Sequence, residues 1–253
     1  AELAKPDVAV VTTIQPVHLE NLGSLEGIRK EKLSIAQGLN PSGTLVLGEG
    51  VQALPKEWKG HTLSIEHDAL DVNFTLNQPT NVRIYNAKLA LLAAKAIGAD
   101  IEIVAKNLTQ ANIEIGRGNI HRINNITIID ESYNANPASI RAALQVLKET
   151  PTTGKRIALL ADMAELGPTA AQLHTGLSDT TEGIDTIICV GPYMKNLANK
   201  INAQHYAKVK DIDLSEFIKT LNVGDVLTIK GSNGQFWAHG FVPKLIEILQ
   251  TDC

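Results

Sequence analysis

The sequence predicts an α/β fold with mostly parallel sheets, because short β-branched runs that end in turn residues alternate with segments of helical apolar spacing. Such alternation is typical of strand–helix–strand units, in which successive strands run parallel. The expected strands are DVAVVTT (7–13), TLVLGE (44–49), NITIID (125–130), RIALLAD (156–162), TIICVG (186–191) and DVLTIKG (225–231). The expected helices span 24–39, 85–99, 137–150, 169–182 and 241–250.

Two α/β parts follow one another along the chain. After the Ala-rich helix expected at 85–99, the polar passage KNLTQANIEIGRGN (106–119) carries two glycines that flank an arginine, and a new strand–helix series begins beyond it. We therefore expect a boundary near residue 107, with one part over 1–106 and another over 107–253. No internal repeat or low-complexity tract is visible, which argues against a solenoid.

Composition and charge narrow the class of protein. The 253 residues are 44% hydrophobic and 20% charged, which is enough apolar content for a sizeable core, and a net charge of -4 gives no reason to expect a nucleic-acid partner. The two cysteines, Cys189 and Cys253, form neither a disulfide framework nor a metal spacing, so we expect a reducing cytoplasm. No apolar run approaches the roughly 20 residues that cross a bilayer, and AELAKPDVAVV does not resemble a signal peptide, so we expect neither export nor membrane insertion.

Polar residues gather where four of the expected strands end. In open parallel sheets, ligands bind beyond the carboxyl ends of the strands, where helix N-termini offer unpaired N–H groups. The four strand exits are TTIQPVHLE, DESYNANP, ADMAELG and KGSNG. We therefore expect the chemistry of the protein at these exits.

The exit DESYNANP (130–137) carries more polar groups than a helix cap needs. Asn136 and Pro137 by themselves are typical of an N-cap and a first helical turn, and for these two alone we favour that structural role. The other residues of the exit are Asp130, Glu131, Ser132, Tyr133 and Asn134. Their oxygens and amides are groups that a polyphosphate or Mg²⁺ binds, which makes this exit a candidate nucleotide site.

These motifs, in this order, resemble the Mur ligase family. DESYNANP is similar to the family's DDSYNANP, ADMAELG followed by His174 is similar to GDMxELG…H, and IKGS matches KGS. Upstream, PVHLENLGSLEGIRKEKLSIAQGL (16–39) is similar to PAHLExFGSxEGIAxAKGEI. The resemblance covers nearly the whole chain. It implies part of a central ATPase-type domain over residues 1–106 and a Rossmann-like C-terminal domain over 107–253.

The resemblance implies ATP-dependent formation of an amide bond. The SYNANP signature is similar to that of the family members that add D-alanyl-D-alanine to a UDP-N-acetylmuramoyl tripeptide during synthesis of peptidoglycan precursors. In that reaction ATP, with Mg²⁺, phosphorylates the terminal carboxylate of the tripeptide, and the amine of D-alanyl-D-alanine attacks the acyl phosphate. Such a site must neutralise a transferring phosphoryl group and hold the reactants in attack geometry. The expected fold is also compatible with family members that add other amino acids, or that add glutamate to folate.

The resemblance also implies roles for residues of the first part. His18 resembles the family histidine that ligates a Mg²⁺ ion, and Lys32 stands where the family has a carbamylated lysine. Carbamylation replaces a repelling ammonium by an anionic oxygen group that supports a hard cation. Taken alone, Lys32 is more typical of a solvated helix face, but the match to the family, with His18, Gly23 and Ser24 in register, favours the functional role. Asn86 is what remains of the family's adenine-binding pattern.

In the second part, Arg117 resembles the family arginine that reaches ATP, and a guanidinium fork suits phosphate. On sequence alone a surface-loop role for Arg117 is equally open, and the KGS turn can also be a simple strand-ending turn. The residues expected to bind nucleotide are Asn86, Arg117, Asp130, Glu131 and Asn134. The residues expected to bind substrate are Tyr133, Asn136, Asp162, Glu165, His174, Lys230 and Ser232. Of these, Asp162, Glu165 and His174 are expected to shape the substrate face rather than to transfer protons.

The chain departs from the family pattern at several places. No G-x-x-x-x-G-K-[ST] phosphate loop occurs, so the chain resembles a ligase that begins partway through its central domain, and the missing N-terminal part becomes a candidate partner. The family's G-x-H-N-V-x-N is TNVRIYN here, so Thr80 and Val82 replace its glycine and histidine, and Arg83 replaces the asparagine that contacts adenine in the family. The second acid of DDSYNANP is Glu131, and one extra methylene can displace a carboxylate by about 1 Å, enough to cost about 100-fold at a catalytic position.

Three interpretations follow. The first is a ligase whose chemistry requires the missing part, with the exit DESYNANP facing ATP and the incoming substrate. The second is a catalytically inactive relative that binds a nucleotide, a peptide or a ligase partner, and the substitutions at 80–83 and 131 favour it. The third, an unrelated α/β binding module or dehydrogenase, requires a glycine-rich dinucleotide turn after a strand, and none is found.

Overall fold

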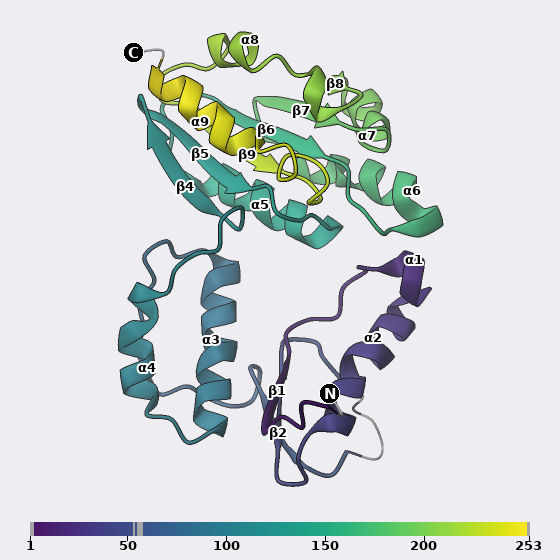
Figure 1. Ribbon diagram of the computed structural model, residues 1–253, viewed down its shortest axis with the longest axis vertical. Helices are drawn as coiled ribbons and strands as arrows, with labels where there is room; N and C mark the ends of the chain where they lie inside the picture. The colour runs from purple at the N-terminus through teal and green to yellow at the C-terminus, as the bar shows by residue number, and fades with distance from the viewer. Residues whose placement is uncertain (1–2, 53, 55–57, 252–253) are drawn as a thin grey trace. The chain divides into compact units, whose positions relative to one another are not determined.

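The computed structural model describes residues 3–52, 54 and 58–251, and Cys253 lies outside these ranges. The chain divides into two compact units, residues 1–112 and 113–253 (Figure 1). The boundary expected near residue 107 would fall at the end of α4 (Ile101–Asn107), and the division lies a few residues beyond it. The reason is that α4 packs on α3 (Asn81–Ala96), and the side-chain amide of Asn77 donates to the Thr109 carbonyl at 2.6 Å, which holds the following turn to the first unit.

Within its described residues, the first unit contains a three-stranded parallel sheet in the order β1–β2–β3. Its strands are β1 (Val8–Val11), β2 (Thr44–Leu47) and β3 (His61–Ser64). Its helices are α1 (Leu19–Leu22), α2 (Leu25–Leu33), the 3-10 helices η1 (Ser34–Gly38) and η2 (Leu108–Gln110), α3 and α4. Leu33 of α2 packs with Leu45 on one face of the sheet, and Leu92 of α3 packs with Val46 on the other, so both faces are covered.

The second unit, over its described residues, contains a six-stranded sheet in the order β4–β5–β9–β6–β7–β8. All neighbouring pairs are parallel apart from β4 and β5, which form an antiparallel hairpin. The strands are β4 (Asn119–Ile123), β5 (Ile126–Glu131), β6 (Arg156–Ala161), β7 (Thr186–Val190), β8 (Gln204–Tyr206) and β9 (Val226–Lys230). The helices are α5 (Pro137–Glu149), η3 (Gly167–Thr169), α6 (Ala170–Thr175), η4 (Gly176–Thr180), α7 (Met194–Ile201), η5 (Val209–Asp211), α8 (Leu214–Lys219) and α9 (Phe241–Thr251).

Helices cover both faces of this second sheet (Figure 1). On one face, Leu245 of α9 and Phe217 of α8 pack in the same cluster as Leu227 of β9. On the other face, Leu144 of α5 packs in the same cluster as Leu160 of β6, together with residues of α7. Burial on both faces explains why the central strands are continuous apolar runs rather than alternating ones.

The α/β class with mostly parallel sheets is confirmed, and each of the six expected strands is present. The expected helix over 169–182 is wrong in its continuity, because the structure has η3, α6 and η4 there. The hydroxyl of Thr180 donates to the Leu177 carbonyl and that of Thr181 to the Ser178 carbonyl, and such side-chain bonds compete with a regular helix. Likewise, α2 ends at Leu33 and continues as η1 instead of running to residue 39.

Strands β3, β4 and β8 and helices α1, α4, α7 and α8 are not among the elements expected from the sequence. Expected helix 85–99 also begins earlier, at Asn81, because the hydroxyl of Thr80 accepts a hydrogen bond from the backbone N–H of Arg83 and caps the helix. No helix within the described ranges combines the length and the apolar character that a bilayer crossing needs.

Candidate functional site

Three neighbouring strands of the second sheet end in the polar motifs of the sequence. Strand β9 lies between β5 and β6, all three run parallel, and the register places Glu131 of β5 beside Lys230 of β9. The exits DESYNANP, KGSNG and ADMAELG therefore meet at one edge of the sheet. This is the edge at which parallel α/β sheets bind ligands.

The exit of β5 is held by its own side chains. Asp130 is 2% exposed, and its carboxylate accepts a hydrogen bond from the backbone N–H of Ser132 at 3.0 Å, while its carbonyl accepts one from Gly118 at 2.6 Å. Asn136 caps α5, because its side-chain oxygen accepts from the Ser139 N–H at 2.8 Å and its own N–H donates to the Ser139 hydroxyl at 2.9 Å. The side-chain oxygens of Asp130 and Asn136 thus have structural partners, in the exit itself and in the first turn of α5.

Lys230 is buried beneath this turn. The residue is 2% exposed, and its ammonium donates to Oε2 of Glu131 at 3.2 Å and to the carbonyl of Asn134 at 3.0 Å. Burial lowers the pKa of Lys230, while the Glu131 carboxylate acts to raise it. The side chain of Asn134 is exposed, and its oxygen accepts from the Ala135 N–H at 2.9 Å. The predicted ligand-binding residue Lys230 therefore contacts the protein itself.

An aromatic and cationic stack stands next to the turn. The guanidinium carbon of Arg117 lies 4.1 Å from the centroid of the Tyr133 ring, and the Trp237 ring meets the same tyrosine edge-on at 5.2 Å. Gly116, at φ 78°, makes the close packing possible, because a Cβ there would lie 2.9 Å from the Trp237 ring. Arg117 is exposed, and Trp237 is 38% exposed. Trp237 was missed by sequence reasoning, and the signal for it is an aromatic residue shortly after a strand exit.

Asp162 joins the exits of β6, β7 and β9. Its two carboxylate oxygens accept hydrogen bonds from the backbone N–H groups of Met194, at 2.7 Å, and Tyr193, at 3.2 Å, where α7 begins. Its carbonyl accepts from the N–H and the hydroxyl of Ser232, at 3.1 and 2.8 Å. Burial raises the pKa of Asp162, and the two backbone N–H donors act to lower it. The residue fixes the loops around it.

His174 is fully buried with both ring nitrogens engaged. Nε2 lies 2.9 Å from the backbone nitrogen of Met163 and accepts its N–H, whereas Nδ1 lies 2.6 Å from the Ala170 carbonyl and must donate to it. These partners assign the neutral tautomer with the proton on Nδ1. Burial lowers the pKa of His174. Glu165, in the same loop, is exposed and has a positive φ of 59°.

In the first unit, Lys32 lies on α2, and His18 immediately precedes α1, which packs on α2. The Lys32 ammonium donates to the Thr13 carbonyl at 2.8 Å, just beyond β1, and the residue lines a hollow of about 430 Å³ with Val11 and Ser34 among its walls. Partial burial lowers the pKa of Lys32. His18 is exposed, with a left-handed φ of 55°.

The altered adenine-binding pattern has structural partners of its own. Thr80 caps α3, and Arg83 donates from Nη1 to the carbonyl and side-chain oxygen of Gln78 at 2.9 and 3.0 Å. Asn86 is exposed on α3. Tyr85, which sequence reasoning missed, joins the exits of β1 and β2, because its hydroxyl donates to the Thr12 carbonyl at 2.7 Å and accepts from the Glu49 N–H at 2.8 Å. No motif in the sequence signals this bridge.

The described part of the chain brings few metal-ligating side chains together. Across the described ranges, no three His, Cys, Asp or Glu side chains come together in a way that could hold a metal ion. Mg²⁺ in phosphoryl-transfer sites keeps several waters and takes about one or two protein carboxylates plus substrate phosphates. His18 and Lys32 therefore form at most part of a ligand set, and Mg²⁺ stays a prediction.

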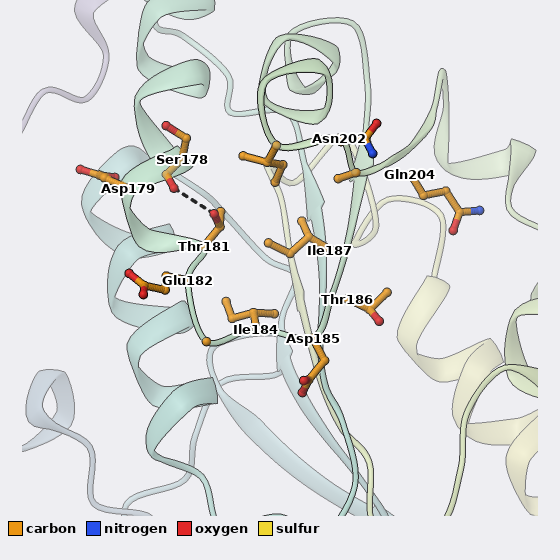
Figure 2. A pocket seen from close by; sticks show the side chains of 13 residues that line it. Ser178, Asp179, Thr181, Glu182, Ile184, Asp185, Thr186, Ile187, Asn202 and Gln204 are labelled. Atoms are coloured by element: carbon orange, nitrogen blue, oxygen red, sulfur yellow. Dashed lines mark hydrogen bonds between the residues drawn. The ribbon is translucent and has the colours of Figure 1, made fainter.

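A hollow of about 570 Å³ lies at the opposite edge of the second sheet, between the start of β7 and the end of α7 (Figure 2). Figure 2 shows the acidic side chains of Asp179, Glu182 and Asp185 around it. Asp179 pairs with Arg141 at 2.6 Å, and Asp185 accepts the backbone N–H of Arg156 at 2.8 Å, so two of the acids have structural partners. This hollow is at the amino ends of the strands, away from the polar exits.

Families and relatives match both units. The Mur ligase middle domain matches residues 1–71, and the Mur ligase glutamate ligase domain matches residues 116–233. The UDP-N-acetylmuramoyl-tripeptide–D-alanyl-D-alanine ligase of Bacillus subtilis is 28% identical over 92% of this chain and 58% of its own length. The ligase of that name from Escherichia coli is 30% identical over 75% of this chain and 48% of its own length. The chain thus spans about half the length of the curated relatives it matches.

Solved structures show the same fold. A crystal structure of MurF from Acinetobacter baumannii superposes with a TM-score of 0.84 at 22% identity, over 97% of this chain and 61% of that one. MurF ligase from Thermotoga maritima, in complex with ADP, superposes with a TM-score of 0.79 at 18% identity, over 99% of this chain and 64% of that one. Two Mur ligase domains are matched in order along most of the sequence, and the fold agrees with them. The chain therefore belongs to the Mur ligase family.

Proposed function

We propose that this chain takes part in the ATP-dependent joining of D-alanyl-D-alanine to a UDP-N-acetylmuramoyl tripeptide. The observation that carries the proposal is the convergence of DESYNANP, KGSNG and ADMAELG on three adjacent parallel strands. Curated relatives bear the name of this activity. Because the chain spans about half of their length and has no phosphate loop, the complete reaction is proposed for this chain together with the portion of the relatives that it does not match. The cytoplasmic location stays a prediction.

In this proposal the nucleotide is oriented by the Arg117 stack. The guanidinium is exposed and held against Tyr133, and a planar fork of this kind suits phosphate oxygens. The exposed amide of Asn134 lies in the neighbouring turn and is the second candidate contact. When bound, ATP supplies the phosphoryl group that activates the tripeptide carboxylate. The residues of the chain itself bind and orient, as phosphoryl-transfer sites require.

The substrate side is proposed to be shaped by the exit of β6. Asp162 and His174 hold the loop through backbone bonds, and they leave Glu165 exposed at its tip. Ser232 joins this loop to the exit of β9. In this arrangement Glu165 contacts substrate while Asp162 and His174 position the loop, which agrees with the expectation that none of the three transfers protons.

Lys32 is proposed to be carbamylated. A lysine reacts with CO₂ as the neutral amine, and partial burial lowers the pKa of Lys32 and so favours that form. In ¹³C-bicarbonate, NMR should show a carbamate signal that disappears in Lys32→Arg and persists in Lys30→Arg, which alters an exposed lysine of the same helix. A signal that survives Lys32→Arg contradicts the assignment.

Phosphate release tests the reaction directly. The full chain is incubated with ATP, Mg²⁺, bicarbonate, the UDP-N-acetylmuramoyl tripeptide and D-alanyl-D-alanine, alone and with the unmatched N-terminal portion of a relative. Release that requires both peptide substrates, and that falls in an Arg117→Ala variant, supports the proposal. Absence of release in both arms, beside an active full-length relative, contradicts it.

A second candidate is a ligand-binding relative without turnover. The observation that favours it is the region 80–83, where Thr80 and Arg83 are engaged in a helix cap and in bonds to Gln78. Calorimetric binding of ATP or of the tripeptide nucleotide, with no phosphate release in the complemented assay, distinguishes this function from the first.

A further inference from the structure

Lys230 is a buried cation whose two hydrogen-bond acceptors, Glu131 and Asn134, both belong to the exit of β5. Its side chain is 3% exposed, that of Glu131 is 28% exposed, and the two residues are direct neighbours in the register of β9 and β5. One ammonium thus joins a carboxylate on the adjacent strand to the Asn134 carbonyl within the following turn. The contact crosses from one strand exit to the next.

The same turn determines where Arg117 lies. The backbone N–H of Tyr133 donates to the Gly116 carbonyl at 3.0 Å, and that of Gly118 donates to the Asp130 carbonyl at 2.6 Å. The segment that carries Arg117 is therefore bonded to the β5 exit on both sides. The guanidinium then stacks on the Tyr133 ring. A displacement of the turn at Tyr133 must displace Arg117 as well.

We propose that Glu131 and Lys230 are a positioning pair, which fixes the turn 132–136 and, through Tyr133, the guanidinium of Arg117, without contacting the ligand. The inference rests on the proposed function only in that Arg117 is taken to bind ATP phosphates. It assigns Lys230 and Glu131 a task that differs from the direct ligand binding expected from the sequence. The observation behind it is that the ammonium is enclosed by protein acceptors.

The length of the Glu131 side chain supports the role of the Glu131–Lys230 pair. The family pattern has aspartate at this position, and aspartate would draw the carboxylate back by about 1 Å, beyond hydrogen-bond range of an ammonium now at 3.2 Å. A buried ammonium that loses its carboxylate is strongly unfavourable, so within this chain shortening the side chain of residue 131 should loosen the contact to Lys230. Glu131 is therefore matched to Lys230, and restoring aspartate is a sharp test.

The first experiment needs no ligand. Hydrogen exchange is measured at the amides of Tyr133 and Ala135 in the full chain and in Glu131→Asp, Glu131→Gln and Lys230→Met variants. We expect exchange to rise about tenfold in each, since a charge-assisted buried bond is lost, while the amide of Cys189 in β7 is unchanged. The Glu131→Gln/Lys230→Met double variant should exchange no faster than Lys230→Met alone.

Tryptophan emission gives an independent signature. In a Trp58→Phe background, Trp237 is the remaining tryptophan and contacts Tyr133 edge-on. Its emission should shift in Glu131→Asp and Lys230→Met, but not in Lys195→Met, which removes an exposed lysine of α7. Unchanged exchange and unchanged emission in Glu131→Asp, which keeps the charge and is the mildest change, overturn the proposal.

Calorimetric titration with MgATP distinguishes a positioning role of the Glu131–Lys230 pair from a role in folding alone. Glu131→Asp should weaken binding about tenfold in the wild-type chain and have no further effect in an Arg117→Ala background, because the pair acts through Arg117. Tighter binding in Glu131→Asp overturns the proposal, since it makes residue 131 a ligand contact. If the wild-type chain does not bind MgATP, the proposed nucleotide site fails, and the exchange measurements alone decide the positioning pair.

Discussion

The carbonyl oxygen of Asp162 accepts two hydrogen bonds from Ser232, one from its backbone N–H at 3.1 Å and one from its hydroxyl at 2.8 Å. The two residues lie 70 positions apart in sequence and follow the adjacent strands β6 and β9. Gly231 allows this approach, since a Cβ there would lie 2.7 Å from the Ala161 side chain. Bonds between neighbouring strand exits thus set the shape of the candidate site.

Ser232→Ala should lower the free energy of unfolding by about 1 kcal/mol, the net contribution of one buried hydrogen bond. The hydroxyl is buried, so its Asp162 partner loses a donor that water does not readily replace. Urea unfolding of the variant measures the effect, with Ser215→Ala as a control at an exposed serine of α8. Equal stability of the two variants contradicts a structural role for the hydroxyl.

Gly116→Ala should be more destabilising than a positive φ alone explains. The added Cβ would meet both the Trp237 ring, at 2.9 Å, and the Tyr133 Cβ, at 3.1 Å. Gly183→Ala is the matched control, because Gly183 has a similar φ of 80° and a Cβ added there would have no atom within 4 Å, so this variant should cost about 1 kcal/mol.

We expect Gly116→Ala to exceed this control by about 1 kcal/mol or more, since overpacking is added to backbone strain. The measurement is chemical denaturation followed by Trp237 emission in a Trp58→Phe background. Similar losses of unfolding free energy in Gly116→Ala and Gly183→Ala would show that the Tyr133 and Trp237 rings shift to accommodate the methyl group.

The free energy of unfolding should fall as the pH is lowered from 6.5 to the folded-state pKa of His174. Burial depresses the pKa of His174 in the folded state below its ordinary value of 6.5, so the unfolded chain takes up the proton first. The contribution of neutral His174 is thus complete above pH 6.5 and is lost as the pH falls through the folded-state pKa. His174→Gln should remove this part of the slope in unfolding free energy against pH. His239→Gln alters an exposed histidine and should retain it.

Arg117→Lys should weaken MgATP binding by about tenfold while the fold is retained. Lysine keeps the charge but has neither the planar fork that pairs with phosphate nor the flat face that stacks on Tyr133. Arg122→Lys on β4 provides a control at an exposed arginine. Isothermal titration compares the two, and equal affinities would mean that charge alone is recognised.

The strands that were not expected from the sequence share a position in the sheets. Each of the missed strands β3, β4 and β8 lies at a sheet edge. The residues of β3, HTLS, are partly or fully exposed, whereas those of β9 are all buried. An edge strand faces solvent and needs no continuous apolar run, so its pattern can be weak, whereas central strands covered on both faces have a strong one. The edge strand β1 was expected because its residues, VAVV, do form an apolar run. The fold class follows from the central strands.

The sequence was sufficient to predict which strand exits carry the candidate site, but not which of its side chains contact one another. The motifs placed Glu131, Asp162 and Lys230 at strand exits, and the strand order brings those exits together. That Lys230 contacts Glu131 and Asn134 depends on β9 lying between β5 and β6, which no local pattern encodes. The contribution of Trp237 depends likewise on a glycine at residue 116, distant in sequence.

The place of β9 has a consequence for how the chain is made. Among the described strands of the second unit it is synthesised after all the others, yet it pairs on both sides, with β5 and with β6. Until it emerges, the inner edges of β5 and β6 expose unpaired backbone groups that can pair with another chain. The described sheet of the second unit is therefore completed at its middle only after β9 is synthesised, when Lys230 and Ser232 arrive between the exits of β5 and β6. Nascent chains stalled before residue 226 should require a chaperone to stay unaggregated.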